Sequence, residues 1–301
     1  MNVSTAHSAS PFRIARRVLS VLKWGVVASL LALGVVSMAA YFRDADRLQQ
    51  VAKQAVNERE PVSQQVVQLV DYVAHDVPRG RPEVYFLSPV FQALKPTACQ
   101  VIDEGGDCAY KARAFIVLAN QLGIESSKLC LHDASGEARH AVARVATERG
   151  DYIVDLLFGI CYRNEDGTPM SIPYIAENLE SIIAAEVDSG NELARKYPVQ
   201  RYPFDDVSTI NWKKSDFWKS AYSTLNVVMS EEQIAGLQRP YFSEEPALMV
   251  AYAAFGCCFM IVIIPPAIRR IWRWRKHRRD DVASTSTESK STEGQVEVAS
   301  E

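Results

Sequence analysis

Three residues of the chain have the types and the order that nucleophilic catalysis requires. Cys108 comes first, His140 follows on a later segment, and Asp155 lies on the next. A cysteine thiolate attacks carbonyl carbon, a histidine moves the proton, and a carboxylate orients the histidine. We therefore predict Cys108 as the nucleophile, His140 as the base and Asp155 as the orienting carboxylate. Gln100 is a candidate oxyanion donor beside the Cys108 N–H, with an ordinary loop glutamine as the alternative.

The residues around Cys108 predict a helix that starts at the cysteine. Residues 105–107 read Gly-Gly-Asp and make a turn, in which Asp107 has a side chain suited to cap a helix. Residues 108–122 are apolar on most sides, as is typical of a buried helix, and Gly123 is a typical helix stop. At the first helical turn, the dipole and the unpaired N–H groups favour the thiolate form of Cys108.

Beyond this helix the hydrophobic period changes to two. Residues 128–132, 139–146 and 152–157 alternate as strands do, and turn residues separate them. In an antiparallel meander, His140 and Asp155 fall on neighbouring strands and can pair side by side. Asp155 lies inside an apolar run, where a carboxylate without a partner is costly to bury, so we expect His140 to be that partner.

These residues form three ordered motifs: Gly106-Asp107-Cys108, His140-Ala141-Val142-Ala143-Arg144-Val145 and Tyr152-Ile153-Val154-Asp155. The stretch from about residue 60 to 165 resembles the transglutaminase-like superfamily, in a membrane-anchored bacterial form. That pattern combines a G-x-C helix start, an H-A-x-x-x-V strand and an aromatic-x-x-D strand. Residues 62–77 resemble the amphipathic helix that such families carry upstream. Val142 departs from the pattern, because an aromatic residue often stands two positions after the histidine.

The resemblance implies an α+β fold with a papain-like core, in which the cysteine-bearing helix packs on an antiparallel sheet. It also implies a Cys-His-Asp triad that acts on amide or ester bonds, by hydrolysis or by acyl transfer, without a metal or another cofactor. The expected substrate is a peptide, a protein or a cell-envelope polymer. The alternative is a membrane-tethered module without catalytic activity, which binds such a molecule or scaffolds a polysaccharide assembly.

Two long uncharged runs, residues 24–42 and 247–264, are each long enough to cross a hydrocarbon core of ~30 Å as a helix. Lys and Arg precede the first run and follow the second, which places both flanks in the cytoplasm. A cleaved signal peptide is the alternative for the first run, because Ser37-Met38-Ala39 offers small residues at a cleavage spacing. We expect a two-pass protein of the inner (plasma) membrane.

The expected organisation follows from these spans. It comprises a basic cytoplasmic leader (1–23), a transmembrane helix (24–42), an extracytoplasmic, periplasmic domain (44–245, core about 60–165), a second transmembrane helix (247–268) and a basic, then disordered, cytoplasmic tail (269–301). Within the domain we predict a polar helical stalk at 44–60, an irregular loop over the cleft at 78–100 and a helix at 173–196. The aromatic-rich segment 197–242 is expected mainly to pack in the core; the alternatives are an interfacial belt for Tyr241 and Phe242, and a platform for a glycan or peptide.

Charge and cysteine content limit the partners and cofactors. The net charge is −3 and no basic face lies outside the membrane flanks, which argues against nucleic acid. Besides Cys108, three cysteines fall in the extracytoplasmic segment, so at most one disulfide forms if Cys108 is free: these are Cys99, Cys130 and Cys161. Less favoured alternatives are a paired Cys108, and a zinc site from Cys130, His132, His140 and Cys161. His132 with Asp133 is the competing base, and the oligomeric state stays open.

The topology is testable by cysteine accessibility. Because both basic flanks belong in the cytoplasm, a cysteine introduced at Ser88 should react with an impermeant thiol reagent added outside intact cells. A cysteine introduced at Ser286 should react only after the membrane is permeabilised. Protection of the Ser88 position from the external reagent would overturn this topology.

Overall fold

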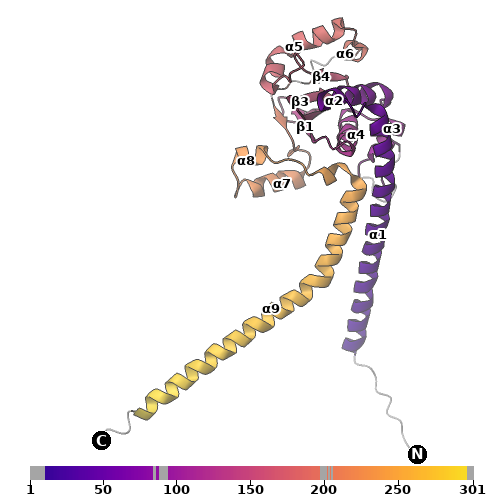
Figure 1. Ribbon diagram of the computed structural model, residues 1–301. Helices are drawn as coiled ribbons and strands as arrows, with labels where there is room; N and C mark the ends of the chain where they lie inside the picture. Colours follow the sequence, from indigo (N-terminus) through magenta and orange to yellow (C-terminus); the bar gives the residue numbers. More distant parts are fainter. Residues whose placement is uncertain are drawn as a thin grey trace, which may run out of the picture. The chain divides into compact units, whose positions relative to one another are not determined.

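The computed structural model describes residues 11–83, 86–87, 94–196, 202, 204 and 206–296. The chain divides into two compact units, Met1–Val36 with Val250–Glu301, and Ser37–Met249. Figure 1 shows the elements of each unit. The loop predicted at 78–100 falls partly on residues outside the described ranges, and its last residues begin a helix, α3 (Ala98–Glu104).

The first unit contains the N-terminal part of α1 (Pro11–Ala55) and most of α9 (Pro246–Val296). Each contains a stretch long and apolar enough to cross a membrane, Arg17–Ala55 and Pro246–Arg270. The two helices touch in this unit, since the Cys258 thiol donates to the Val27 carbonyl at 3.6 Å. A Cβ added at Gly34 would lie 2.6 Å from the Phe255 ring, so the glycine is what lets the ring approach.

The end of α9 differs from the predicted disordered tail. The helix continues through Pro265 and Pro266 and reaches Val296, so it includes most of the Ser/Thr/Glu-rich segment. The first turn is the costly step of helix formation, and a segment that extends an existing helix does not form a new nucleus. A prediction of disorder from composition considers only how much apolar surface a segment can bury. It does not take account of the helix to which the segment is attached.

A five-stranded antiparallel sheet forms the centre of the second unit, in the order β4-β3-β2-β1-β5. Its strands are β1 (Ser126–His132), β2 (Ala138–Thr147), β3 (Gly150–Asp155), β4 (Ile160–Tyr162) and β5 (Val207–Ser208). The three predicted strands are confirmed. The two edge strands were not predicted, because three residues and two residues are too short to give an alternating pattern.

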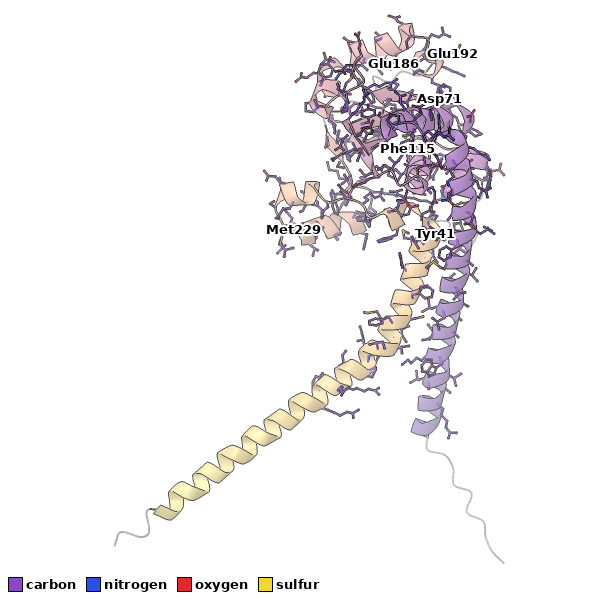
Figure 2. The ribbon with its side chains drawn as sticks, viewed as in Figure 1. Tyr41, Asp71, Phe115, Glu186, Glu192 and Met229 are labelled. Atoms are coloured by element: carbon purple, nitrogen blue, oxygen red, sulfur yellow. The ribbon has the colours of Figure 1, made fainter. Side chains whose placement is uncertain are left out.

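Helices cover both faces of this sheet (Figure 1). One core contains apolar residues of α1, of α2 (Val62–Asp71) and of α4 (Cys108–Gln121), packed on β2 and β3. The other lies under α5 (Ile172–Asp188) and α6 (Glu192–Lys196). Phe115 of α4 is fully buried and lies inside the unit in Figure 2. The mixed α+β architecture predicted from sequence is therefore present.

The helix that carries Cys108 has the predicted boundaries to within one residue. Every residue from Lys111 to Ala119 is buried, as expected for a helix in the core. After Gln121 the chain turns at Gly123, whose φ is +73°, and the Ile124 N–H donates back to the Ala119 carbonyl at 2.9 Å. This glycine stop fixes the far end of the helix.

Two predicted segments differ in detail. Residues 44–60 do not form a free stalk, because Leu48 and Ala52 of α1 are buried in the core of the second unit. The helix predicted at 173–196 is interrupted at Gly190, whose φ is +97°, and continues as α6. The described part of the chain also contains α7 (Asp216–Leu225), α8 (Glu231–Ala235) and the 3-10 turn η3 (Tyr241–Glu244).

The amphipathic helix predicted at 62–77 is α2 followed by a π-helical turn, η1 (Tyr72–Asp76). The buried ammonium of Lys111 donates to the carbonyls of Val73 and Ala74, each at 2.9 Å. A π turn leaves carbonyls out of the regular ladder, and the lysine satisfies them inside the core. Burial, and then the charge of Arg79, lower the pKa of Lys111 to about 8.

This contact predicts a stability difference between two lysines. Lys111→Met keeps the chain length but leaves two buried carbonyls without a donor, so it should lower the free energy of unfolding by about 1–3 kcal/mol. Lys53→Met removes a half-exposed lysine 3.5 Å from Glu58 and should change it by less than about 0.5 kcal/mol. Urea unfolding of the detergent-solubilised chain measures both. Equal effects of the two substitutions would contradict this role of Lys111.

Candidate functional site

The turn before α4 sets the position of Cys108. Gly105 has a φ of +101°, and a Cβ there would lie 2.8 Å from the Pro78 carbonyl oxygen. The Asp107 carboxylate then caps the helix, accepting from Ala109 N at 3.1 Å and Tyr110 N at 3.2 Å. Cys108 is consequently the first residue of α4, as predicted. The Cys108 N–H donates neither of these two capping bonds, and no other hydrogen bond from it is present in the described part of the chain.

His140 and Asp155 are in direct contact. His140 Nε2 lies 2.6 Å from Asp155 Oδ2, and the two residues are 3% and 0% exposed. The other carboxylate oxygen, Oδ1, accepts from Leu157 N at 2.9 Å and Phe158 N at 3.3 Å. The carboxylate is therefore fixed by the backbone of the following turn, and only Oδ2 is directed at the histidine.

A β-bulge lies next to the histidine. In the β1–β2 pair, Leu131 faces His140 but His132 faces Ala138, so Arg139 is an extra residue on β2. Bulges bend a strand and redirect the neighbouring side chains, and they are frequent beside functional sites. This bulge was not predicted from the sequence.

Two aromatic rings cover the His140 imidazole. Tyr202 stacks on it with ring centroids 4.4 Å apart and an interplanar angle of 21°, and Phe158 lies at 5.6 Å. Neither was singled out as a site residue from the sequence. Phe158 follows Asp155 closely enough to have been considered, whereas nothing in the spacing connects Tyr202 with the histidine. Together they shield the hydrogen bond of the imidazole from water.

The second ring nitrogen of His140 is the one left for Cys108. Nδ1 is buried and has no hydrogen-bond partner of normal geometry in the described part of the chain. Burial by itself would lower the pKa of His140. The charge and hydrogen bond of Asp155, followed by the nearby Cys108 side chain, instead raise the pKa to about 10. The imidazolium form is thus favoured beside the sulfur at neutral pH.

A cavity of about 630 Å³ opens onto these groups. Cys108 and His140 both line it, together with Tyr110 of α4 and Phe242 of η3. Such a volume is sufficient for a peptide segment or another small acyl substrate. Asp155 does not line the cavity and reaches it only through the histidine.

The remaining predicted site residues lie elsewhere. Gln100 is not among the residues lining the cavity, because its side chain belongs to the capping box of α3, where Oε1 accepts from Thr97 N at 2.8 Å. Both ring nitrogens of His132 make other contacts, Nδ1 with the Gly136 carbonyl at 3.2 Å and Nε2 with the Ser208 hydroxyl at 2.7 Å. Asp133 is held within the same turn, 2.7 Å from Arg139 Nε.

All six cysteines are unpaired. Burial raises the pKa of the Cys99 thiol to about 12 and that of the Cys161 thiol to about 12, and it raises the pKa of Cys130 as well. These three are held as neutral thiols, which are poor nucleophiles. Cys108 differs from these three in its position, because it is the first residue of α4.

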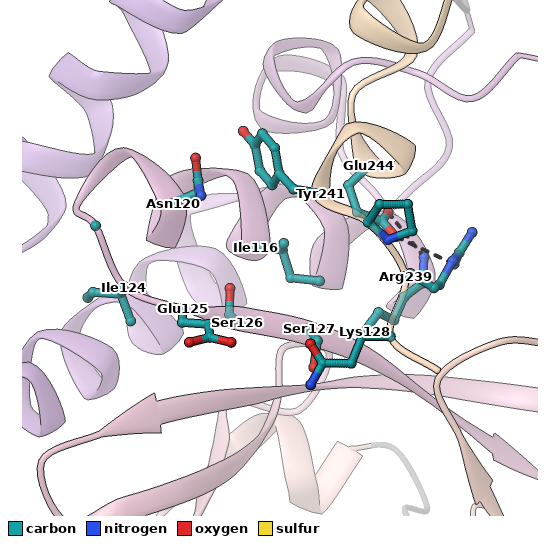
Figure 3. A pocket seen from close by; sticks show the side chains of 13 residues that line it. Ile116, Asn120, Ile124, Glu125, Ser126, Ser127, Lys128, Arg239, Tyr241 and Glu244 are labelled. Carbon is teal, nitrogen blue, oxygen red and sulfur yellow. Dashed lines mark hydrogen bonds and ion pairs between the residues drawn. The ribbon is translucent and has the colours of Figure 1, made fainter. Parts of the chain in front are cut away.

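A second cavity, of about 410 Å³, lies between the end of α4 and the start of β1 (Figure 3). Ile116, Asn120 and Ser127 are among the residues that line it. It contains none of the three predicted catalytic residues, but it shares Lys128 and Arg239 with the cavity at Cys108. We therefore assign the chemistry to the larger cavity.

Comparisons with known proteins give only distant likenesses. No protein-family model matches the sequence, and no curated protein sequence matches it significantly. A candidate cysteine protease from Cytophaga hutchinsonii is similar in structure at 20% identity and a TM-score of 0.29, over 38% of this chain and 37% of that one. A candidate protease from Parabacteroides distasonis is similar at 11% identity and a TM-score of 0.30, over 43% of this chain and 26% of that one.

A third likeness is to a Rad4/XPC nucleotide excision repair complex, at 10% identity and a TM-score of 0.28, over 85% of this chain and 64% of that one. The chain spans little more than a third of the length of the first of these structures and about a quarter of the second. Likenesses at this level carry no argument about function. The proposal that follows depends on the geometry of the site.

The raised pKa of His140 predicts a pH-dependent contribution to stability. An unfolded histidine titrates near pH 6.5, whereas here the pKa is about 10. The stabilisation from the charged pair is therefore fully present below about pH 6.5 and is lost as the pH rises through about 10. Urea unfolding of the wild-type chain and of His140→Gln should differ most at low pH. A difference that stays constant up to pH values above 10 would contradict the charged pair.

Proposed function

We propose that this protein is a membrane-anchored thiol enzyme of transglutaminase-like type, which acts on an amide or ester bond through Cys108, His140 and Asp155. The observation that carries the proposal is the buried 2.6 Å contact between His140 Nε2 and Asp155 Oδ2. It leaves Nδ1 to the cysteine at the start of a buried helix. Cysteine, imidazole and carboxylate in this relation are what a thiol acyl-transfer site needs.

The reaction has two halves. The Cys108 thiolate attacks the carbonyl carbon, and the Cys108 N–H is placed to stabilise the oxyanion that forms. His140 Nδ1–H then gives its proton to the departing amine or alkoxide, and a thioester to Cys108 remains. Water or an incoming amine next attacks the thioester, His140 takes up the proton, and the thiolate is released. Throughout, Asp155 Oδ2 accepts the hydrogen bond from Nε2–H and holds the ring in place.

The membrane arrangement belongs to the same proposal. The two helices that are long and apolar enough to cross a membrane lie at either end of the second unit in the sequence. With their basic flanks in the cytoplasm, residues 44–245 are extracytoplasmic, and periplasmic in a bacterium. The substrate is then a peptide, a protein or a polymer of the cell envelope.

Acylation by a chromogenic acetate ester tests the triad without knowledge of the substrate. The wild-type chain should release one equivalent of chromophore in a burst and carry an acetyl group on Cys108 in its mass spectrum. Cys108→Ala should abolish the burst, and His140→Ala should slow it by roughly a thousandfold. Asp155→Asn should slow it by at least roughly tenfold, because the imidazole loses its orienting charge.

The matched control for the base is His132→Ala. His132 is also a buried strand histidine, at 7% exposure, but its ring nitrogens are engaged by Gly136 and Ser208. Its loss should leave the burst rate unchanged within about twofold when thermal melting shows that the variant folds. A burst that survives in His140→Ala and disappears in His132→Ala would show that the base is assigned to the wrong residue.

A further inference from the structure

The cavity at Cys108 is lined by an excess of basic side chains. Six of its lining residues carry a basic group: Lys95, Arg113, Lys128, Arg139, Lys214 and Arg239. Asp107 supplies the one carboxylate in the same set of lining residues. Its oxygens are already used, by the N–H groups at the start of α4 and by Arg81 at 3.8 Å. Arg139 is paired with Asp133 and Glu137, neither of which lines the cavity, and the other basic groups leave the wall beside the nucleophile positive.

One buried carboxylate, that of Glu244, forms ion pairs with three of these basic side chains. Glu244 lies 3.2 Å from Arg113 Nε, 3.3 Å from Lys128 Nζ and 3.4 Å from Arg239 Nη1. In Figure 3, dashed lines mark the interactions of Lys128 and Arg239 with this carboxylate. Glu245 carries only part of a negative charge at neutral pH, because burial raises its pKa to about 7. The cluster therefore keeps a net positive charge.

Lys95 has no such partner. No ion pair joins it to a carboxylate in the described part of the chain, although it lines the cavity within the field of this cluster. Burial, followed by the charges of Arg113 and Lys128, lowers its pKa to about 6, and the charge of Glu244 opposes this only in part. An anion placed beside the amine would offset the effects of burial and of these charges, and would restore the positive charge of the amine.

We propose that the cavity recognises substrates that carry an oxyanion, a carboxylate or a phosphate, beside the acyl group that Cys108 attacks, and that Lys95 binds this oxyanion. The inference rests on the proposed function and specifies its substrate class. A purely structural role would account for the cations that contact Glu244, because they neutralise a buried charge. It does not account for Lys95, because its half-buried amine contacts no carboxylate in the described part of the chain and lies near a cluster whose basic groups already outnumber its carboxylate.

Charged thiol reagents test this inference without knowledge of the natural substrate. Cys108 of the full-length, detergent-solubilised chain is modified by an anionic (sulfonatoethyl), a neutral (methyl) and a cationic (trimethylammonioethyl) methanethiosulfonate. Each rate is divided by the rate of the same reagent with a free small thiol, and the Cys108 peptide is followed by mass spectrometry. The anionic reagent should have the highest normalised rate and the cationic reagent the lowest.

Lys95→Gln should reduce the normalised preference for the anionic over the neutral reagent by roughly three- to tenfold, and leave the neutral rate unchanged. The matched control is Lys219→Gln, which makes the same substitution at an exposed lysine that does not line the cavity and lies 3.3 Å from Asp216. It should leave the preference intact. If Lys95→Gln and Lys219→Gln behave alike, Lys95 does not bind the anion and the inference is wrong.

Two competitors distinguish the kinds of oxyanion. Inorganic phosphate and glutarate are tested for protection of Cys108 from the neutral reagent, and Lys95→Gln should weaken whichever protection is found. Protection by one assigns a phosphate or a carboxylate, and protection by neither contradicts the inference. A Cys108 that reacts with the neutral reagent no faster than Cys99 would instead overturn the proposed function. The two failures are therefore separable.

Discussion

The hydrogen bond between His140 Nε2 and Asp155 Oδ2 is the contact on which the candidate site depends. Both side chains are almost wholly excluded from water, and either charge alone would be costly at that depth. The sheet register brings the pair together, the turn after β3 holds the carboxylate, and Tyr202 and Phe158 close over the ring. Each of these features serves to keep one imidazole in one orientation.

The position of the sulfur is fixed by a second set of polar contacts, along α4. The helix starts at Cys108 because Asp107 caps it, and its buried lysine, Lys111, ties it to the π turn η1. Arg113 ties the same helix to η3 through Glu244. Polar groups buried with partners specify a position more narrowly than apolar packing does. The cysteine thus belongs to an element with little freedom to shift relative to the sheet.

The parts of this arrangement that are local in sequence could be predicted. The turn before Cys108, the glycine stop at Gly123 and the three long strands each follow from a few adjacent residues. The pairing of His140 with Asp155 also follows, because a meander of short turns determines which strands are neighbours. What could not be predicted depends on distant segments. Tyr202 reaches the histidine from far along the chain, and nothing in the local pattern of Arg113 indicates that its partner is Glu244.

In two other cases a local sequence pattern predicted a feature that the structure does not contain, because a stronger interaction replaced it. The polar segment at 44–60 predicts a stalk, yet it carries Leu48 and Ala52 at helical spacing, and these are buried in the core. Gln100 precedes the cysteine closely enough to donate to an oxyanion, but its side chain completes a capping box in α3. Tertiary burial decides the first case, and a nearer hydrogen-bond partner decides the second.

Alkylation of Cys108 by neutral iodoacetamide tests the central claim most directly, because it reports the reactivity that His140 gives to the sulfur without a substrate. The account predicts that His140→Ala lowers the alkylation rate of Cys108 at neutral pH by at least roughly tenfold, because the histidine that assists the sulfur is gone. His132→Ala should retain the wild-type rate. Equal rates in the wild-type chain and in His140→Ala would contradict the pairing of Cys108 with His140.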